Sequence, residues 1–427
     1  MGLTGNRTYV GFGLGAIQSG LFLHEAYQSG AFRRLVVAEV LPGVVSAVRS
    51  AGGKIEINIA HHDRIEQSSV NSIEVLDPAL PDERQHLVDA VAEAGEIGTA
   101  IPSVDYYATD QPSSLHQILS AGLRKKVTIG GPQAVIYTAE NNNHAAEILN
   151  DLVIGEIPSR YQPSVNERVC FLNTVIGKMS QVLTEPEEIQ RGALSRITPD
   201  LERAFLVEAF NRILISKIQF DQPFDRGITT FIEKEHLLPF EEAKLYGHNA
   251  VHALGGYLGS FFGLHYMADV KAVPGMVDFL RRAFIEEAGQ ALISKYQHVD
   301  ALFTAQGFET YVDDLLQRMM NPFLMDRIER VTRDPARKLG WNDRLIGTMR
   351  MVLNQGGQPV RFALGAAGAL AALHQGSFSS DVLDELWGLD KPDEEQKVKI
   401  ITMIEEGWNV LHRWRENQAT DLVFDIA

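Results

Sequence analysis

The sequence is poor in cysteine, with Cys170 alone among 427 residues. A single cysteine excludes an intrachain disulfide and favours a reducing, cytoplasmic setting. Long hydrophobic runs are also missing, because no stretch reaches the roughly 18 apolar residues that a membrane span requires. The apolar stretch 10–23 is interrupted by glycines and polar residues and follows no basic segment, so we expect no signal peptide.

Basic residues are scarce relative to acidic ones: 39 Lys and Arg stand against 55 Asp and Glu, a net charge of −16. Such a surface repels phosphate backbones, so we expect no nucleic-acid partner. A small anionic ligand is not excluded, because a few local cations can bind one. The hydrophobic content of 45% and charged content of 22% are typical of a globular protein. At roughly 100–200 residues per domain, the length predicts two or three domains.

The first 195 or so residues alternate short runs rich in β-branched residues with segments of helical periodicity. This alternation predicts a largely parallel sheet with helices on both faces. Strands are expected over residues 9–12, 35–40, 54–59, 96–101, 127–129, 134–138 and 168–173.

The pattern becomes helical after residue 197. Helices are expected over residues 201–214, 240–255, 275–292, 310–319, 325–331, 341–353, 361–373, 380–386 and 396–416. A few strand-like residues lie within 213–220 and 228–233. The predicted fold is therefore an α/β Rossmann-type dinucleotide-binding domain over 1–197, followed by a mostly α-helical substrate domain over 198–427.

A glycine-rich turn lies near the start, where residues 9–20 read YVGFGLGAIQSG. A strand that runs through glycines into a helix is typical of a dinucleotide-binding turn, because the backbone must approach a pyrophosphate at a helix N-terminus. Gly11 and Gly13 occupy the first two glycine positions, and Ala16 occupies the third. The alternative is a glycine-rich turn without a ligand. The cofactor contacts predicted here are Gly11, Gly13, Leu14, Gly15, Ala16 and Ile17.

An acidic residue, Glu39, ends the second expected strand, roughly 20–25 residues beyond the glycines. An acid at this place binds the ribose hydroxyls of NAD. No arginine follows it to offset a 2′-phosphate, so the sequence favours NAD over NADP. Thr99 and Ala100 end a further strand and are expected to line the cofactor crevice, although a plain strand exit would have the same pattern.

Ionisable and amide side chains gather on one expected helix. At about 100° per residue, they share one side of an otherwise apolar helix. Burial of such a set is costly unless its members are paired or functional. The residues concerned are Glu241, Lys244, His248, Asn249 and His252.

These groups suit the oxidation of an alcohol. A lysine of lowered pKa can take the hydroxyl proton as hydride leaves, an amide can donate to the oxygen, and a histidine can orient either partner. Two alternatives stand beside this interpretation. Lys244 can be a solvated lysine beside core histidines, or His248, His252 and Glu241 can bind a metal. Because no His-Glu-x-x-His motif and no nearby cysteine is present, we expect no metal.

The spacing of Lys244, Asn249 and His252 resembles that of the mannitol dehydrogenase family, the polyol-specific long-chain dehydrogenases. The resemblance implies a general base at Lys244 and a histidine, His252, that orients the substrate oxygen or the lysine. It also implies that Asn173, within residues 169–176, acts with Asn249 to stabilise the reacting oxygen. The family's usual Asp-Arg pair after that strand is replaced here by Gly177-Lys178.

Residues 327–339 and 342–346 look most like the mannitol-1-phosphate 5-dehydrogenase branch of the family. Within them, Arg333, Arg337 and Lys338 form a compact basic group that can clamp a phosphate. The alternative is a charged loop that pairs with Asp334 and Asp343. With His248, this basic group makes up the expected substrate-binding set.

The predicted function is NAD-dependent interconversion of mannitol 1-phosphate and fructose 6-phosphate by hydride transfer. One alternative is the same chemistry on a free polyol or a hexuronate. Others are a metal-dependent enzyme and a dinucleotide-sensing protein without catalysis. The expected partner is a small polyol or its phosphate, with no nucleic acid and no membrane, and the expected state is a monomer or small homo-oligomer.

Overall fold

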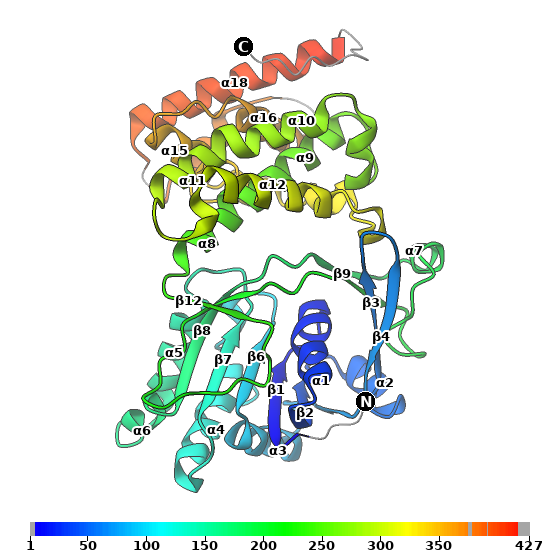
Figure 1. Cartoon of the computed structure of the whole chain (residues 1–427), viewed down its shortest axis with the longest axis vertical. Helices are drawn as coiled ribbons and strands as arrows, with labels where there is room; N and C mark the ends of the chain where they lie inside the picture. The colour runs from blue at the N-terminus through cyan, green and yellow to red at the C-terminus, as the bar shows by residue number, and fades with distance from the viewer. Residues whose placement is uncertain (1–4, 375–377, 391, 417–427) are drawn as a thin grey trace. The chain divides into compact units, whose positions relative to one another are not determined.

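The computed structural model describes residues 5–374, 378–390 and 392–416, and the chain divides into two compact units, Met1–Leu238 and Pro239–Ala427 (Figure 1). The expected boundary after residue 197 therefore falls inside the first unit. Three later strands of this unit explain the difference, because they complete its sheets. They are β10 (Ala204–Glu208), β11 (Leu214–Ser216) and β12 (Ile232–Lys234).

The first unit is built on an eight-stranded sheet in the order β12-β11-β8-β7-β6-β1-β2-β5. The strands from β8 to β5 are all parallel, while β11 runs antiparallel to β8. This arrangement confirms the predicted Rossmann-type domain. The bounds are β1 (Arg7–Phe12), β2 (Phe32–Ala38), β5 (Ile73–Leu76), β6 (Glu96–Thr99), β7 (Ala134–Thr138) and β8 (Val169–Val175).

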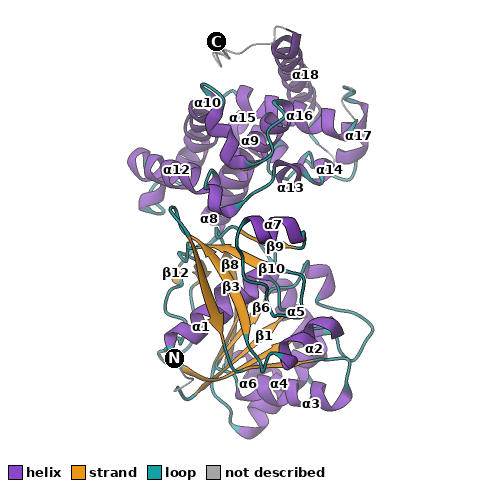
Figure 2. Ribbon diagram, turned by 90° about the vertical axis from the view of Figure 1, so that its right-hand side faces the viewer, coloured by secondary structure: helices purple, strands orange, loops and turns teal. Residues whose placement is uncertain are grey.

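Each face of this sheet has its own apolar core. In β1, Tyr9 packs in one core, while Val10 and Phe12 pack in the other. Helices cover the sheet, as Figure 2 shows. They are α1 (His24–Ser29), α2 (Pro42–Ser50), α3 (Pro81–Glu93), α4 (Leu115–Ile129), α5 (Ala145–Glu156) and α6 (Gln162–Asn166). The strand expected over 127–129 is wrong, because these residues form the last turn of α4.

A second sheet of four strands has the order β4-β3-β10-β9. Its other members are β3 (Ile55–Ala60), β4 (Ile65–Val70) and β9 (Ser180–Leu183), and the short helix α7 (Pro186–Arg191) follows β9. The helix expected over 201–214 is wrong, because 204–208 form β10. All five residues of β10 are buried, and a short run whose first four residues are apolar carries no period that separates strand from helix.

The second unit is almost wholly helical, as predicted. Its main elements are α8 (Leu238–Glu242), η3 (Ala243–His248), α9 (Asn249–Phe261), η4 (Met267–Ala272), α10 (Met276–Arg282), η5 (Ala283–Gly289), α11 (Gln290–Lys295), α12 (Ala305–Met319), η7 (Pro322–Leu324), α13 (Ile328–Thr332), α14 (Pro335–Lys338), α15 (Ile346–Asn354), α16 (Val360–Leu373), α17 (Asp381–Trp387) and α18 (Glu394–Glu416).

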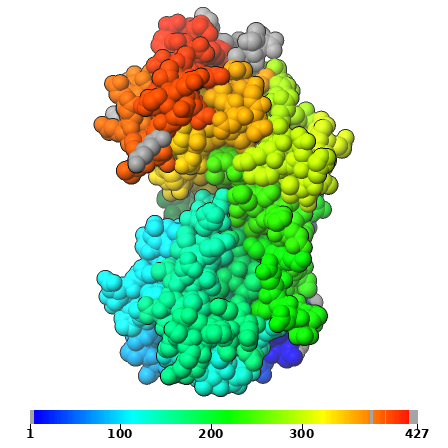
Figure 3. Space-filling view, turned by 90° about the vertical axis from the view of Figure 1, so that its left-hand side faces the viewer, coloured from blue at the N-terminus to red at the C-terminus, as the bar shows by residue number. Residues whose placement is uncertain are grey.

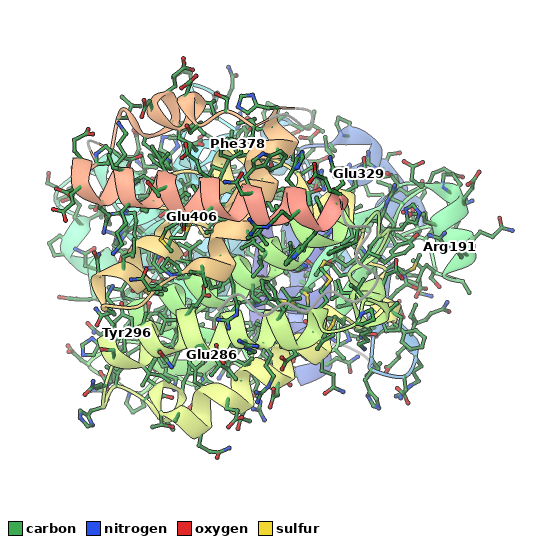
Figure 4. All side chains as sticks on the ribbon, turned by 90° about the horizontal axis from the view of Figure 1, so that it is seen from above. Arg191, Glu286, Tyr296, Glu329, Phe378 and Glu406 are labelled. Carbon is green, nitrogen blue, oxygen red and sulfur yellow. The ribbon has the colours of Figure 1, made fainter. Side chains whose placement is uncertain are left out.

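Helix α16 lies at the centre of this unit and packs against α9 and α18. Glycines permit the close approach: a Cβ on Gly365 would lie 2.9 Å from Leu254, and one on Gly407 would lie 2.9 Å from the Ala363 carbonyl oxygen. Helix α18 lies on the outside of the unit, where Glu406 is exposed (Figures 3 and 4). Within the described ranges, no helix has both the length and the apolar character needed to cross a membrane.

Candidate active site

The glycine turn follows β1 at the carboxyl ends of the parallel strands. Gly13 has a φ of +82°, which side chains rarely tolerate, and an added Cβ would lie 2.8 Å from the Ala100 carbonyl oxygen. Its N–H donates to the Ala38 carbonyl at 2.9 Å. Gly13 therefore lets the turn pass between the ends of β2 and β6, where dinucleotides bind in open parallel sheets.

Gly11 also has a structural role inside the protein. A Cβ there would lie 2.2 Å from Nε2 of Gln18, which is fully buried and donates to the Tyr9 hydroxyl at 2.7 Å. Gly11 thus makes room for a side chain of the protein. Around Gly15 nothing lies within 4 Å of an added Cβ, so the turn is open at this point. The helix begins at Ala16 and continues through Ile17 into the π-helical η1 (Gln18–Leu23).

The open turn and the helix start together fit a dinucleotide, because free N–H groups at a helix N-terminus favour a pyrophosphate. Glu39 fixes this turn. Its carboxylate accepts the N–H of Leu14 and the N–H of Leu41, each at 2.8 Å. The Leu14 N–H is therefore already bound within the protein. Each carboxylate oxygen has a second lone pair, so Glu39 can also accept a ribose hydroxyl.

Thr99 and Ala100 lie at the end of β6. Thr99 is fully buried and donates to Glu140 at 2.8 Å, while the Ala100 N–H donates to the Phe12 carbonyl at 3.0 Å. Glu140 also accepts the Ile101 N–H at 2.9 Å and the Tyr107 hydroxyl. Burial raises the Glu140 pKa, and these hydrogen bonds oppose that effect. Sequence reasoning assigned no role to Glu140, although an acid two residues after a buried strand was a usable signal.

Asn173, near the end of β8, is engaged by helix α5. Its Oδ1 accepts the Ala146 N–H at 2.8 Å, and its Nδ2 donates to Glu147 at 2.7 Å. Nearby in sequence, Lys178 is buried and donates to Asn211 at 2.7 Å, and Asn211 in turn donates to Glu25 at 2.6 Å. Lys178, Asn211 and Glu25 thus form a hydrogen-bonded chain inside the first unit.

The Lys-Asn-His residues lie on one helix of the second unit, formed by α8, η3 and α9 in succession. The η3 segment is a π-helical turn that runs from Ala243 to His248. Such turns are rare and often mark functional sites. Because the turn is wider than an α-turn, the expected 100° step does not hold between Lys244 and His248. Gly247 makes the turn possible, since an added Cβ would lie 2.6 Å from the Phe284 ring.

Lys244 has a lowered pKa. Burial, followed by the positive charge of Arg344, lowers it from 10.5 to about 8, and Glu241 opposes the shift. Among the described residues, its ammonium group has no hydrogen-bond or ion-pair partner. A lysine that is both unpaired and easily deprotonated is suited to proton transfer.

His248 and His252 lie beside each other, with ring centroids 6.4 Å apart. Burial, with the neighbouring His252, lowers the His248 pKa well below 6.5, so its imidazole is neutral. No three His, Cys, Asp or Glu side chains in the described ranges are grouped as metal ligands. His252 instead binds Asp326, with 2.9 Å between Nε2 and Oδ2. Asp326 was missed by sequence reasoning because it lies 74 residues from its partner.

The basic group at α14 divides into two kinds of residue. Arg333 and Arg337 are exposed, and Arg337 lies 4.0 Å from Asp334. Lys338 is buried and donates to the Arg333 carbonyl. Burial, with the charges of Arg344 and Arg337, lowers its pKa to about 8. Of the three cations expected to form a phosphate clamp, two are therefore available to solvent.

A parallel dinucleotide-binding sheet and a helical unit that carries an unpaired lysine of lowered pKa define a two-domain dehydrogenase. Residues 7–223 match the mannitol dehydrogenase Rossmann domain, and residues 236–406 match the mannitol dehydrogenase C-terminal domain. The chain belongs to the mannitol dehydrogenase family and is an NAD-dependent polyol oxidoreductase. The resemblance noted in the sequence is thereby confirmed.

Relatives differ in the substrate that their names state. Mannitol-1-phosphate 5-dehydrogenase of Bacillus licheniformis is 25% identical, over 84% of this chain and 86% of its own. The enzyme of the same name from Geobacillus stearothermophilus is 27% identical, over 74% and 75%. Pseudomonas fluorescens mannitol 2-dehydrogenase, solved with NAD and D-mannitol, has a TM-score of 0.72 at 14% identity, covering 99% of this chain and 95% of that one. Because the sequence identity to the mannitol 2-dehydrogenase structure is 14%, that similarity shows the fold alone.

Proposed function

We propose that the protein interconverts mannitol 1-phosphate and fructose 6-phosphate, with Lys244 as the general base. The observation that carries the proposal is the unpaired ammonium group of Lys244 on the π-helical turn, with its pKa lowered to about 8. The names of the relatives, mannitol-1-phosphate 5-dehydrogenases at 25–27% identity, support the choice of substrate.

In the oxidation, neutral Lys244 takes the proton of the substrate hydroxyl while the C–O bond becomes a carbonyl. NAD, when bound, supplies the acceptor for the hydride that leaves the same carbon. In the reverse direction the Lys244 ammonium returns the proton to the oxygen. Because the pKa is near 8, both protonation states are accessible near neutral pH, as reversible proton transfer requires.

Asn249 is proposed to donate an amide N–H to the reacting oxygen. Its side chain makes no hydrogen bond with the described residues, so the amide is available. Asn173 has one N–H left after its bond to Glu147, and we assign that N–H to the same oxygen. An amide donor stabilises the negative charge that develops on an alkoxide. His248, which is neutral, is assigned to a substrate hydroxyl.

For the cofactor, we assign the pyrophosphate to the turn residues Gly11, Gly13 and Gly15 and to the helix start at Ala16 and Ile17. Glu39 is assigned to the adenosine ribose through its remaining lone pairs. Leu14, Thr99 and Ala100 are assigned to the walls of the crevice, since their polar groups already have partners.

For the phosphate, we assign Arg333 and Arg337, and we limit Lys338 to support of the Arg333 backbone. The test is NADH oxidation by the purified chain with fructose 6-phosphate and fructose side by side, in EDTA. We expect turnover of the phosphate ester, and we expect each of the single variants R333Q and R337Q to raise KM for it by about 10- to 100-fold, because each charge-assisted hydrogen bond contributes about 1.5–3 kcal/mol.

The matched control is R327Q, because Arg327 is a partly exposed arginine of this region that pairs with Glu329 at 2.8 Å. Its KM should not change. Turnover of fructose alone would keep the lysine chemistry and reject the phosphate assignment. Turnover of neither substrate, while NADH still binds, would reject the proposed reaction.

A further inference from the structure

The histidine of the Lys-Asn-His helix has a buried carboxylate partner. Asp326, whose side chain is 3% exposed, accepts from His252 Nε2 through Oδ2 at 2.9 Å. Its other oxygen, Oδ1, accepts from Arg330 Nε at 2.9 Å and Nη2 at 2.6 Å. Both carboxylate oxygens are therefore bound, one by the helix residue and one by α13.

The backbone around Asp326 is also fixed. The Met267 N–H donates to the Asp326 carbonyl at 2.8 Å. Met325, directly before it, has a φ of +50°, in the left-handed region that non-glycine residues rarely adopt. Such a conformation persists where the surroundings enforce it. Here it ends the short helix η7 and turns the chain so that Asp326 meets His252.

The protonation of this pair follows from the hydrogen bonds. Burial by itself would raise the Asp326 pKa, but the hydrogen bonds and charges of His252 and Arg330 outweigh it, and the pKa is lowered. An ionised carboxylate can only accept hydrogen bonds, so Nε2 of His252 carries the proton. In the neutral imidazole, Nδ1 then has the free lone pair. This nitrogen makes no hydrogen bond within the part of the chain described, and the side chain is 16% exposed.

We propose that Asp326 is a positioning residue that holds His252 in its Nε2–H tautomer and presents Nδ1 as an acceptor to a substrate hydroxyl. The inference deepens the proposed function and rests on it for the identity of the substrate. It also leaves Nε2 of His252 unable to serve as a metal ligand while Asp326 is ionised. Of the charged and titratable groups around the pair, Arg330 on α13 binds Asp326, and His248 on η3 lies beside His252.

The tautomer is measurable in the full-length wild-type chain by ¹⁵N NMR of the histidine rings at pH 7.5, with His252 assigned from the variant H252Q. We expect a protonated Nε2 and an unprotonated Nδ1. In D326N the Asn amide can donate to Nε2, so the Nδ1–H tautomer should appear. A wild-type His252 protonated at Nδ1 alone would overturn the proposal, and this measurement does not depend on turnover or on the folding of D326N.

The kinetic test compares D326N with wild type in fructose 6-phosphate reduction. We expect kcat to fall by about 10- to 100-fold, as for other second-sphere partners of functional histidines, with the Kd for NADH unchanged. D326E should recover part of kcat because it restores an ionised acceptor. The matched control is D313N, an exposed aspartate on α12 that is paired with Arg281 at 2.7 Å, and it should retain full activity.

A folded D326N with kcat within about twofold of wild type would reject the positioning role. A wild-type chain that turns over no polyol or ketose would reject the proposed function, and the tautomer would still decide whether Asp326 controls His252. If D326N fails to fold, the wild-type tautomer and the D326E kinetics give the answer.

Discussion

Lys244 determines how the reaction should depend on pH. Oxidation of the alcohol requires the neutral amine, whose fraction increases as pH rises through the pKa of about 8. Reduction of the ketose requires the ammonium form, so its rate should fall as pH rises through the same value. We expect kcat for oxidation to increase about eightfold between pH 6.5 and 7.5 and to level off above pH 9, as measured by NADH formation.

The variant K244M keeps the length of the side chain but removes the titrating group. We expect kcat to fall by about 10²- to 10⁴-fold and the remaining activity to lose its dependence on pH near 8. Binding of NADH, followed by its fluorescence, should be unchanged. K271M is the control because Lys271 is an exposed lysine of the same unit. A pH dependence that survives in K244M would assign the proton transfer to another group.

The residues around Lys244 show which part of a site a sequence can reveal. Lys244, Asn249 and His252 lie within nine consecutive residues, so their spacing was visible. Asp326 was not, because only folding brings it within 2.9 Å of His252. Asn173 shows the opposite case: the sequence identified the residue, and the structure shows that its amide also fixes the start of α5. These contacts depend on tertiary packing, which no local pattern encodes.

The π-helical turn η3 is the feature of the helix that sets the direction of Lys244 relative to Asn249. Gly247 permits it, because an added Cβ would lie 2.6 Å from the ring of Phe284 on η5. In G247A the ring or the helix must move, so we expect a loss of about 1–3 kcal/mol in the free energy of unfolding. A shift of η3 would also displace Lys244, and kcat should fall more than the Kd for NADH rises.

G155A provides the comparison. Gly155 also lies inside a helix, α5, but nothing lies within 4 Å of an added Cβ. It should gain roughly 0.5–1 kcal/mol, because alanine is the better helix former. Urea unfolding and steady-state kinetics measure both variants. A G247A protein with wild-type stability and kcat would show that the turn does not depend on the missing side chain.

At the level of elements, the predictable features were those with a clear period or a capping signal. The sequence indicated the start of α8 near Pro239 and the glycine turn after β1. It did not indicate η3, because a π-turn inserts a residue without changing composition. It assigned 204–208 to a helix, because the first four of these residues are apolar and only the last, Glu208, is polar, so no alternation of polar and apolar residues reveals the period. Pairing with β3 and β9 decides that this segment is a strand.

The division of the molecule into two compact units can be tested by cutting the chain at different residues. Two apolar cores pack against the two faces of the large sheet, and their described residues all lie between Tyr9 and Phe231. The first unit therefore contains the apolar surface that it needs to fold. A chain cut after residue 197 would lose β10, which pairs with both β3 and β9 in the smaller sheet. It would also lose the core side chains Phe205, Val207, Ile213, Ile215, Ile228 and Phe231.

We therefore expect residues 1–238 to fold alone, with a cooperative thermal transition, and to bind NADH without turning over any polyol, because Lys244 is absent. Residues 1–197 should expose β3 as an unpaired edge and fail to give such a transition, since an open edge and an incomplete core favour aggregation. Circular dichroism measures the thermal transition of each fragment, and NADH fluorescence measures whether each fragment binds the cofactor. Cooperative folding of 1–197 with NADH binding would place the domain boundary where the change in sequence pattern falls and make the later strands an addition to a complete domain.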